Sequence, residues 1–561
     1  MNRIPITACS CGFRARGSTF SPIVRTFATT SSNSAANPKG KGKAKGSKDK
    51  YPGWKPTIGV ELHVQLKGNQ KLFSKAVFHH DALPNSDVAI LDASLPGALP
   101  VLEPKTVRLA LLACLAFNSE INLNSTFDRK HYFYPDQPMG YQITQKYCKS
   151  PPLAKGGKIR IRTNQKDEFV EVRLDQVQLE QDTAKSFHDT EISGTLIDLN
   201  RAGTALIEIV TKPDLSSAEE AATFVKTLQA ILRHVGASGA NMERGEMRCD
   251  VNVSVQRADD ETIGSGTRCE VKNLNGVRFI AGAIESEISR QIELLSRNEP
   301  VIQSTRGYDA MTGKTFHLRS KEDAPDYRYF PDPELGPIAL TAEQIEALRA
   351  ELPELPDAAF ERLQSQYSLS ARDAGILVAL GEGIEAESGE DAERAGEGSA
   401  SIGVTYFERV AKGRDSKVAA NWVIHELLGQ LTKTGYTLLN NPIEPEEFGP
   451  LVDAVTENRL TGTNAKALLR DYLSGTVSTD SERPTFSSHL SSVLAASPPP
   501  PSATSFLPLV LEIIESHPAE VDKIKKGQVK VVMRLVGELM KRSGGKADAK
   551  WARKEFEDRL K

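Results

Sequence analysis

Apolar and polar side chains alternate along the stretch Ile58-Gly59-Val60-Glu61-Leu62-His63-Val64-Gln65-Leu66, apart from the small Gly59. A period of two is typical of a β-strand that buries one face. Glu61 and His63 share the polar face and lie about 6.6 Å apart along the strand. A carboxylate and an imidazole at this spacing can hold one metal ion or one phosphate, although a solvated polar face on an ordinary strand has the same pattern.

The bulk composition limits the classes of protein that fit. A chain of 561 residues exceeds one ordinary core, so we expect several domains. Hydrophobic residues make up 39% and charged residues 25%, which is typical of globular proteins that fold in water. The net charge of -3 requires any nucleic-acid contact to come from local basic patches. The sequence has no run of 18 apolar residues, so no membrane-spanning segment is expected.

Residues 1–50 have the composition of an organellar transit peptide followed by a basic linker. The first 48 residues contain Arg3, Arg14, Arg16 and Arg25 and no acidic residue, and Ser and Thr are dense from Ser18 to Ser34. Alternating Gly and Lys from Lys39 onward predict a flexible cationic linker. A basic tail without any targeting role would have the same composition.

Several strands expected between residues 51 and 340 carry acidic and basic side chains on their polar faces. If they converge in one sheet, the carboxylates suit Mg²⁺ and the cations suit phosphates. The candidate ligands are Glu61, Glu180 and Asp250, and the candidate phosphate contacts are Arg201, Arg248 and Lys272. The chain has no Gly-x-x-x-x-Gly-Lys-Ser/Thr loop, so an ATP site would have to be built on the sheet.

Aromatic and basic residues are interleaved in Phe127-Asp128-Arg129-Lys130-His131-Tyr132-Phe133-Tyr134-Pro135-Asp136. Such a run can contact phosphates and stack on a nucleic-acid base. It is equally typical of a strand that turns one aromatic face into a core. The sequence leaves these two interpretations open.

The character of the chain changes after residue 340. Thr341 and Gln344 form a capping-box pattern that predicts a helix start, and helical patterning continues to about residue 448. An acidic, Gly-rich insert at 381–401 is expected to be disordered. The pattern of residues 449–561 predicts a second helical region. It contains a low-complexity insert at 475–505, which we expect to form an exposed loop. Basic residues in its last helices can follow an RNA backbone or form a solvated face.

Six motifs in order make the chain resemble the B subunits of the glutamyl-tRNA(Gln) amidotransferases, in a mitochondrial form. They are Gly59-Val60-Glu61-Leu62-His63-Val64, Phe127 to Asp136, Asp198-Leu199-Asn200-Arg201 with Gly203-Thr204, Met247 to Asn252, Lys272-Asn273-Leu274-Asn275 and Asp326-Tyr327-Arg328-Tyr329-Phe330-Pro331. The resemblance implies ATP- and Mg²⁺-dependent conversion of Glu-tRNA(Gln) to Gln-tRNA(Gln) in the mitochondrial matrix. This chain would phosphorylate the tRNA-borne glutamate, and ammonia from a partner glutaminase (amidase) subunit would attack the γ-glutamyl phosphate. A small third subunit completes such complexes.

The resemblance also implies an α+β fold. A glutamine-synthetase-like catalytic sheet domain at 51–340 would precede a helical domain at 341–448 and a small all-α tail domain at 449–561 that grips the tRNA. It places Glu61, His63 and Glu180 at catalytic, metal-binding positions, and Asp250 is a further candidate for both roles. Arg201, Arg248 and Lys272 are the candidate contacts to ATP. Two other functions stay open: a non-catalytic tRNA-binding scaffold, and a self-contained ligase that uses free ammonia.

Overall fold

The computed structural model describes most of the chain from Lys50 to Leu560. The residues outside the described set are 1–49, 147, 149, 163–168, 190–192, 260–265, 321–325, 381–401, 458, 476–483, 497–505, 526–530, 544–546, 548 and 561. The expected transit peptide and linker therefore lie outside the described residues, except for Lys50. The expected acidic insert at 381–401 lies outside them as well.

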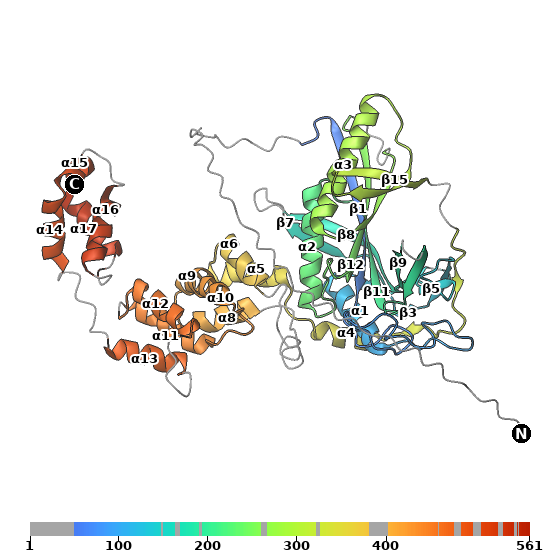
Figure 1. The fold of residues 1–561 in the computed structure, drawn as a ribbon, viewed down its shortest axis with the longest axis horizontal. Coiled ribbons are helices and arrows are strands. Elements are labelled where there is room, and N and C mark those ends of the chain that lie inside the picture. The colour runs from blue at the N-terminus through green and yellow to red at the C-terminus, as the bar shows by residue number, and fades with distance from the viewer. Residues whose placement is uncertain are drawn as a thin grey trace, which may run out of the picture. The chain divides into compact units, whose positions relative to one another are not determined.

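A ten-stranded sheet dominates the region up to residue 340, in the order β15-β14-β13-β12-β1-β11-β8-β6-β2, with β7 paired to β8 off this path (Figure 1). The pairing is antiparallel except between β13 and β14. The strands are β1 (Trp54–Gln65), β2 (Glu120–Ile121), β6 (Ala154–Lys155), β7 (Lys158–Arg162), β8 (Phe169–Gln181), β11 (Ala205–Thr211), β12 (Met247–Arg257), β13 (Cys269–Leu274), β14 (Ser304–Asp309) and β15 (Lys314–Ser320).

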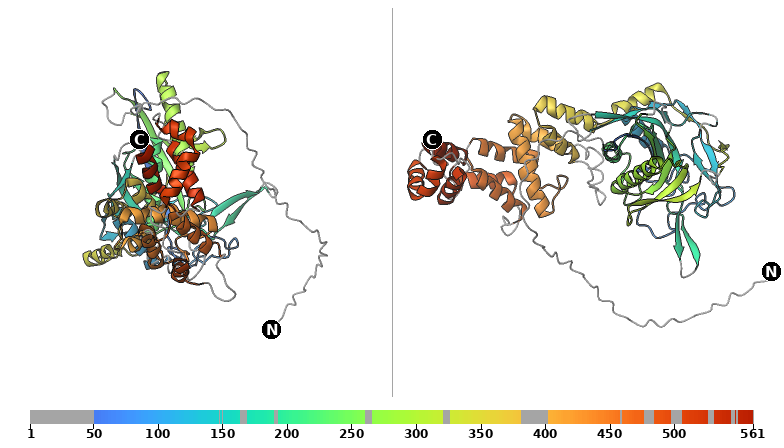
Figure 2. Two further views of the ribbon diagram at one scale, coloured as in Figure 1. Left: turned by 90° about the vertical axis from the view of Figure 1, so that its left-hand side faces the viewer. Right: turned by 90° about the horizontal axis from the view of Figure 1, so that it is seen from above.

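Three smaller sheets complete this region. One contains β16 (Phe330–Pro331), β4 (Asp128–His131) and β5 (Tyr141–Thr144), and another contains β17 (Ile338–Ala339) and β3 (Asn124–Ser125). The third pairs β9 (Lys185–Asp189) with β10 (Gly194–Asp198), and this hairpin projects from the domain (Figure 2). Because β5 packs against β8, the second strand layer lies beside the polar face of the large sheet.

The alternation along residues 58–66 is confirmed as the inner strand β1, which lies between β11 and β12. Its side chains Ile58, Val60, Leu62 and Val64 are at most 1% exposed, because every second residue of the strand points into the core. Glu61 and His63 point to the opposite face and are half-buried. The core is closed by α1 (Pro104–Ala116), α2 (Ala218–His234) and α3 (Val277–Ser296), of which α3 packs on β12 and α2 on β7.

The remaining residues are helical, as the sequence predicts. The capping box of α4 (Ala342–Ala350) is confirmed, with Thr341 and Gln344 in the expected roles. Next come α5 (Pro356–Tyr367), α6 (Ala371–Ala379), α8 (Ile402–Ala411), α9 (Ser416–Asn421), the π-helix η2 (Trp422–Leu427), α10 (Leu428–Thr434), α11 (Pro445–Thr456), α12 (Gly462–Leu473) and α13 (Phe486–Ala496). The last group is α14 (Leu507–Ser516), α15 (Pro518–Lys525), α16 (Val532–Arg542) and α17 (Ala549–Leu560).

Two separate cores divide these helices at a different point from the one expected. The first core runs from Phe360 to Leu490, so a boundary at 448 and 449 would fall within α11 and within this core. The second core begins at Val510 and ends at Leu560. The stretch 475–505, expected to be an exposed loop, contains the helix α13. Its Phe486 is fully buried, with its ring centroid 5.1 Å from that of Tyr472.

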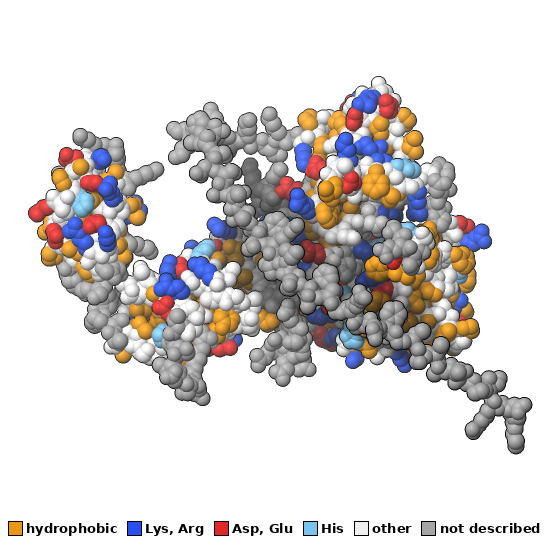
Figure 3. Space-filling view, in the orientation of Figure 1, with side chains coloured by type: hydrophobic (Ala, Val, Ile, Leu, Met, Phe, Trp, Pro, Cys, Tyr) orange, Lys and Arg blue, Asp and Glu red, His pale blue; other side chains and the backbone are white. Residues whose placement is uncertain are grey.

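Two surface properties bear on function. Among the described residues, no helix combines the length and apolarity that crossing a bilayer requires. On the visible face in Figure 3, basic, acidic and hydrophobic side chains are interspersed. A charged ligand would therefore be recognised by a local cluster of side chains on this face and not by a field of one sign.

Candidate active site

Three adjacent strands bring acidic side chains together on the polar face of the large sheet. In the register of β1 and β11, His63 lies opposite Glu208. In the register of β11 and β8, Glu208 lies opposite Gln178, and Glu180 is two residues further along β8. Residues two apart share one face of a strand, so Glu61, His63, Glu180 and Glu208 converge. We call these four residues the carboxylate cluster.

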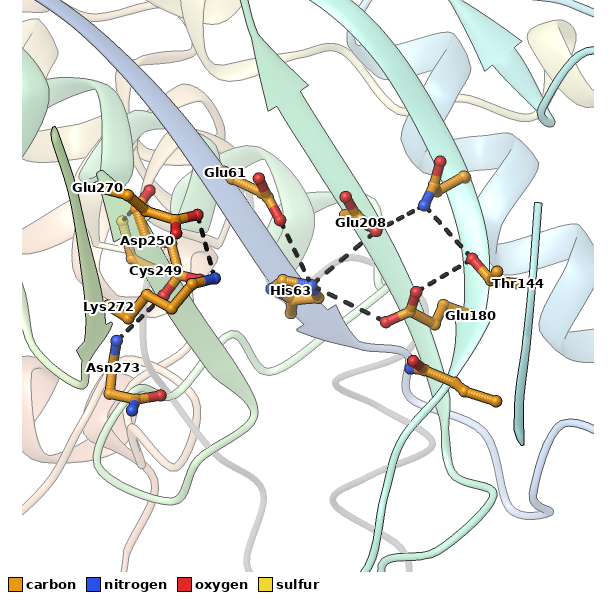
Figure 4. A network of polar contacts seen from close by, with 12 residues as sticks. Glu61, His63, Thr144, Glu180, Glu208, Cys249, Asp250, Glu270, Lys272 and Asn273 are labelled. Atoms are coloured by element: carbon orange, nitrogen blue, oxygen red, sulfur yellow. Dashed lines mark hydrogen bonds and ion pairs between the residues drawn. The ribbon is translucent and has the colours of Figure 1, made fainter. Parts of the chain in front are cut away.

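The imidazole of His63 lies among the three carboxylates (Figure 4). Its Nε2 atom is 3.9 Å from Glu61 Oε1, 3.9 Å from Glu180 Oε1 and 4.0 Å from Glu208 Oε2. These distances exceed a hydrogen bond. Glu61, His63 and Glu208 each offer one ligand atom within 4.8 Å of the others, which is the spacing needed to share one metal ion.

Burial and mutual repulsion make the carboxylates hard to ionise together. Burial, and then the charge of Glu208, raise the pKa of Glu61 to about 7. Burial, and then the charge of Glu180, raise the pKa of Glu208 to about 7. A cation in the cluster would remove this repulsion, and oxygen ligands of this kind suit Mg²⁺. The donor set therefore fits a divalent cation.

Buried polar side chains fix two of these carboxylates. Thr144 on β5 donates a hydrogen bond of 3.0 Å from Oγ1 to Glu180 Oε2. Gln178 donates one of 2.5 Å from Nε2 to Glu208 Oε2, and its Nε2 also lies 3.4 Å from Thr144 Oγ1. Both residues are at most 3% exposed. We call Thr144 and Gln178 the clamp, because their hydrogen bonds hold the two carboxylates; Figure 4 shows Thr144 beside Glu180.

Asp250, the remaining candidate ligand, lies next to the carboxylate cluster but binds other groups. It faces Glu61 in the register of β1 and β12. Its carboxylate accepts hydrogen bonds of 2.8 Å from Lys272 Nζ and 3.0 Å from the backbone N–H of Asn273. Lys272 Nζ also lies 3.1 Å from Glu270 Oε1. Burial lowers the pKa of Lys272, but Asp250 and Glu270 outweigh burial and raise it, so the amine stays charged.

The two candidate arginines both approach Asp182, which follows β8. Arg248 Nη2 lies 2.6 Å from Asp182 Oδ2, and Arg201 Nε lies 3.5 Å from the same atom. Arg201 also donates hydrogen bonds of 2.9 and 2.8 Å to the carbonyls of Thr183 and Ala184. Arg201 thus anchors the loop after β8, whereas Arg248 has an acidic partner that a phosphate could replace.

Sequence reasoning did not nominate Glu208, Thr144 or Gln178. A signal for Glu208 was available, because it is the only charged residue in the apolar strand Ala205–Thr211. Its partner across the sheet depends on the pairing of β1 with β11, more than 140 residues away in sequence. Thr144 and Gln178 are uncharged, and only their position under the carboxylates distinguishes them from other buried polar residues.

Comparisons with known proteins agree on one family. Residues 56–346 match the family model described as the GatB/GatE catalytic domain. Residues 405–489 and 499–560 match the model described as the GatB domain.

Curated relatives cover nearly the whole chain. A mitochondrial glutamyl-tRNA(Gln) amidotransferase B subunit of Mycosarcoma maydis is 41% identical over 91% of this chain and 87% of its own length. A protein of the same name from Cryptococcus neoformans is 44% identical over 91% of this chain and 94% of its own length. The aspartyl/glutamyl-tRNA(Asn/Gln) amidotransferase B subunit of Mesorhizobium japonicum is 41% identical over 88% of this chain and 93% of its own length.

Proposed function

The chain belongs to the family of glutamyl-tRNA(Gln) amidotransferase B subunits, and from this premise we propose that it acts in the conversion of Glu-tRNA(Gln) to Gln-tRNA(Gln). The enzyme is a carbon–nitrogen ligase with glutamine as nitrogen donor. This chain is the subunit that uses ATP. It works in mitochondria, in the matrix, and its partners there are a glutaminase (amidase) subunit plus a small third subunit.

The carboxylate cluster is the observation that carries this proposal. A carboxylate is a poor electrophile, so amidation of the tRNA-borne glutamate requires activation. A γ-carboxylate oxygen attacks the terminal phosphorus of ATP, ADP leaves, and a γ-glutamyl phosphate forms. Ammonia then attacks the γ-carbonyl carbon and phosphate leaves. Mg²⁺, when bound, would offset the negative charge on the transferring phosphoryl group.

The residues that would hold Mg²⁺ are Glu61, His63 and Glu208, with Glu180 beside His63 as a further ligand. Their own task is to present ligand atoms to the ion, and the clamp supports this by donating hydrogen bonds that orient Glu180 and Glu208. Asp250, the other ligand expected from the sequence, is paired with Lys272 in this proposal and does not hold the ion.

Phosphate contacts come from the cations beside the cluster. Lys272 and Arg248 lie on the neighbouring strands β13 and β12 and are paired with Asp250 and Asp182. A phosphate oxygen would compete with these carboxylates for the same N–H donors. Arg201 acts from the loop after β8, and its contacts to backbone carbonyls keep that loop in place.

The other parts of the chain receive supporting roles in this proposal. The sheet region is a catalytic domain similar to that of glutamine synthetase, since this chain and glutamine synthetase would both form a γ-glutamyl phosphate. The core from Val510 to Leu560 belongs to a tail domain that binds tRNA. In α16, Val532, Leu535, Val536 and Leu539 face this core, and Arg534 points outward with 73% of its side chain exposed.

The test of this function is a reconstitution of the complex with Glu-tRNA(Gln), ATP and a nitrogen donor. We expect Gln-tRNA(Gln) and ADP with glutamine only when the glutaminase subunit is present. Ammonium chloride should replace glutamine in the complex. If ATP is not consumed with either donor, the chain is a scaffold. If the purified chain alone is fully active with ammonium chloride, the chain is a self-contained ligase.

A further inference from the structure

Seven aromatic side chains gather at the surface where two segments distant in sequence meet. One segment continues β4, and the other leads into β16, which pairs with β4 so that Phe330 lies opposite Arg129. We call the seven the aromatic surface cluster: His131, Tyr132, Phe133, Tyr134, Tyr327, Tyr329 and Phe330.

Six of the seven rings form two groups in contact. His131 and Phe330 are stacked with centroids 4.4 Å apart and an interplanar angle of 22°. The centroid of Tyr132 is 5.6 Å from that of Tyr134 and 6.0 Å from that of Tyr327. Tyr327 in turn lies 6.1 Å from Tyr329. Flat rings in such contact present an extended aromatic surface.

This surface does not belong to the core. Phe133 is 87% exposed, Tyr134 55% and Phe330 46%. Phe127, from the same run of sequence, is 1% exposed and packs edge-on against Phe73. The aromatic run thus supplies one ring to the core and leaves others in solvent. Of the two interpretations that the sequence leaves open, the exposure favours a binding surface.

Two lysines connect the aromatic surface cluster to the carboxylate cluster. Lys130 Nζ lies 4.9 Å from the centroid of Tyr327, and Lys146 Nζ lies 5.8 Å from that of Tyr329. The positive charges of both amines act to lower the pKa of the nearby Glu208 carboxyl. Within the described part of the chain, neither lysine has a carboxylate oxygen within 4.0 Å. Lys146 is exposed, so its charge is available to a ligand.

We propose that the aromatic surface cluster binds the unpaired 3′ end of the aminoacylated tRNA, with bases stacked on Phe133 and Phe330 and a backbone phosphate near Lys146. This inference rests on the proposed function. Unpaired bases stack on exposed aromatic side chains, and lysines beside them neutralise the backbone. The cluster has more exposed rings than a single base requires. Lys130 and Lys146 link it to the carboxylate cluster, where the attached glutamate has to be placed.

The test measures binding of two RNAs to the complete complex: uncharged tRNA(Gln), and the same tRNA without its last three nucleotides. For wild type, we expect the truncation to weaken binding about tenfold, the usual effect of losing base stacking. In the double variant Phe133→Ala/Phe330→Ala, full-length tRNA should bind as weakly as the truncated one. Phe316→Ala is the matched control, because Phe316 is 48% exposed on the distant edge strand β15.

Three results would overturn the inference. The truncation could weaken binding of the double variant as much as it weakens binding of wild type. The KM for ATP could rise in the double variant, which would place the adenine of ATP on these rings. The glutaminase subunit could fail to co-purify with the double variant, which would make the cluster a subunit interface.

Lys146→Ala tests the phosphate contact separately. It should lower the slope of log Kd against log salt concentration by about one, and an unchanged slope would contradict the contact. The binding assays do not depend on phosphoryl transfer, so they can fail while the proposed function holds. Absence of ADP formation by the wild-type complex would instead refute the proposed function.

Discussion

His63 on β1 lies directly opposite Glu208 on β11, with 4.0 Å between the imidazole Nε2 and the carboxylate Oε2. A slip of one residue in this pairing would turn Glu208 to the other face of the sheet and leave an apolar residue opposite His63. The buried residues Leu62, Val64, Ile207 and Ile209 prevent that slip, because they would have to face solvent. The hydrophobic core therefore determines which carboxylates surround the imidazole.

The clamp should control metal affinity without contacting the substrate. Thr144→Val removes the hydrogen bond to Glu180, and Gln178→Leu removes the one to Glu208. Loss of such supporting contacts typically weakens metal binding by about 10- to 100-fold. We expect each variant to need correspondingly more Mg²⁺ for ATP consumption and to bind Mn²⁺ more weakly in electron paramagnetic resonance titrations.

Thr223→Val is the control for the clamp, because the Thr223 hydroxyl donates only to a carbonyl within α2. Its Mg²⁺ requirement should match that of wild type. Wild-type Mn²⁺ affinity in both clamp variants would show that Thr144 and Gln178 are merely structural.

The carboxylate cluster should make stability depend on pH. The folded-state pKa values of Glu61 and Glu208 are about 7, above the ordinary 4.5. The folded state therefore retains protons that the unfolded state has lost, so this contribution is fully present below pH 4.5 and is lost as the pH rises through 7. In EDTA, raising the pH from about 5 to about 8 should lower the thermal midpoint of wild type more than it lowers that of Glu208→Gln.

The same protons compete with a metal. Mg²⁺ should raise the thermal midpoint of wild type at about pH 8 more than at about pH 5, because the ligands must be deprotonated. Parallel pH profiles for wild type and Glu208→Gln in EDTA would contradict the raised pKa values.

Asp250 provides a contrast with the cluster. Since its oxygens accept from Lys272 and from Asn273, we expect Asp250→Asn to lower the KM for ATP, because Lys272 loses a carboxylate that competes with phosphate, while leaving the Mn²⁺ affinity unchanged. The sequence-based role of Asp250 as a ligand predicts the opposite, a loss of Mn²⁺ affinity at unchanged KM. Measuring both quantities on one variant decides between the two roles.

The helix α13 should be essential to the helical core. Phe486 is fully buried, so Phe486→Ala should lower the free energy of unfolding by about 3–5 kcal/mol. Leu511→Ala, at a position that is 46% exposed, should cost much less. Urea denaturation followed by tryptophan fluorescence measures both, and equal midpoints for Phe486→Ala and wild type would mean that α13 does not pack as described.

Local patterns predicted the elements whose signal lies within a few residues. The alternation around Glu61 and His63 needed no distant partner, and the capping box at Thr341 is complete within four residues. The α13 segment was misjudged because its abundant Ser and Pro neighbours suggested a loop. Phe486, Leu490 and Val493 nevertheless follow the spacing of one helix face, and all three join the core.

The site required information that the sequence does not express locally. Glu61 and His63 could be paired as neighbours on one strand, but their meeting with Glu180 and Glu208 depends on the order of β1, β11 and β8. Asp250 lies beside Glu61 in the register of the sheet, yet its hydrogen-bond partner is on β13. Which charge pairs with which is a property of the assembled sheet.

The most direct test of the central claim is phosphorylation of Glu-tRNA(Gln) by the complex carrying Glu208→Gln. The substitution keeps the size of the side chain and removes the negative charge that faces His63. The account predicts that γ-glutamyl phosphate, trapped with hydroxylamine, is lost or restored only at much higher Mg²⁺, while glutamine hydrolysis by the glutaminase partner continues. Phosphorylation at the wild-type rate and the wild-type Mg²⁺ requirement would contradict the assignment of the carboxylate cluster as the metal site.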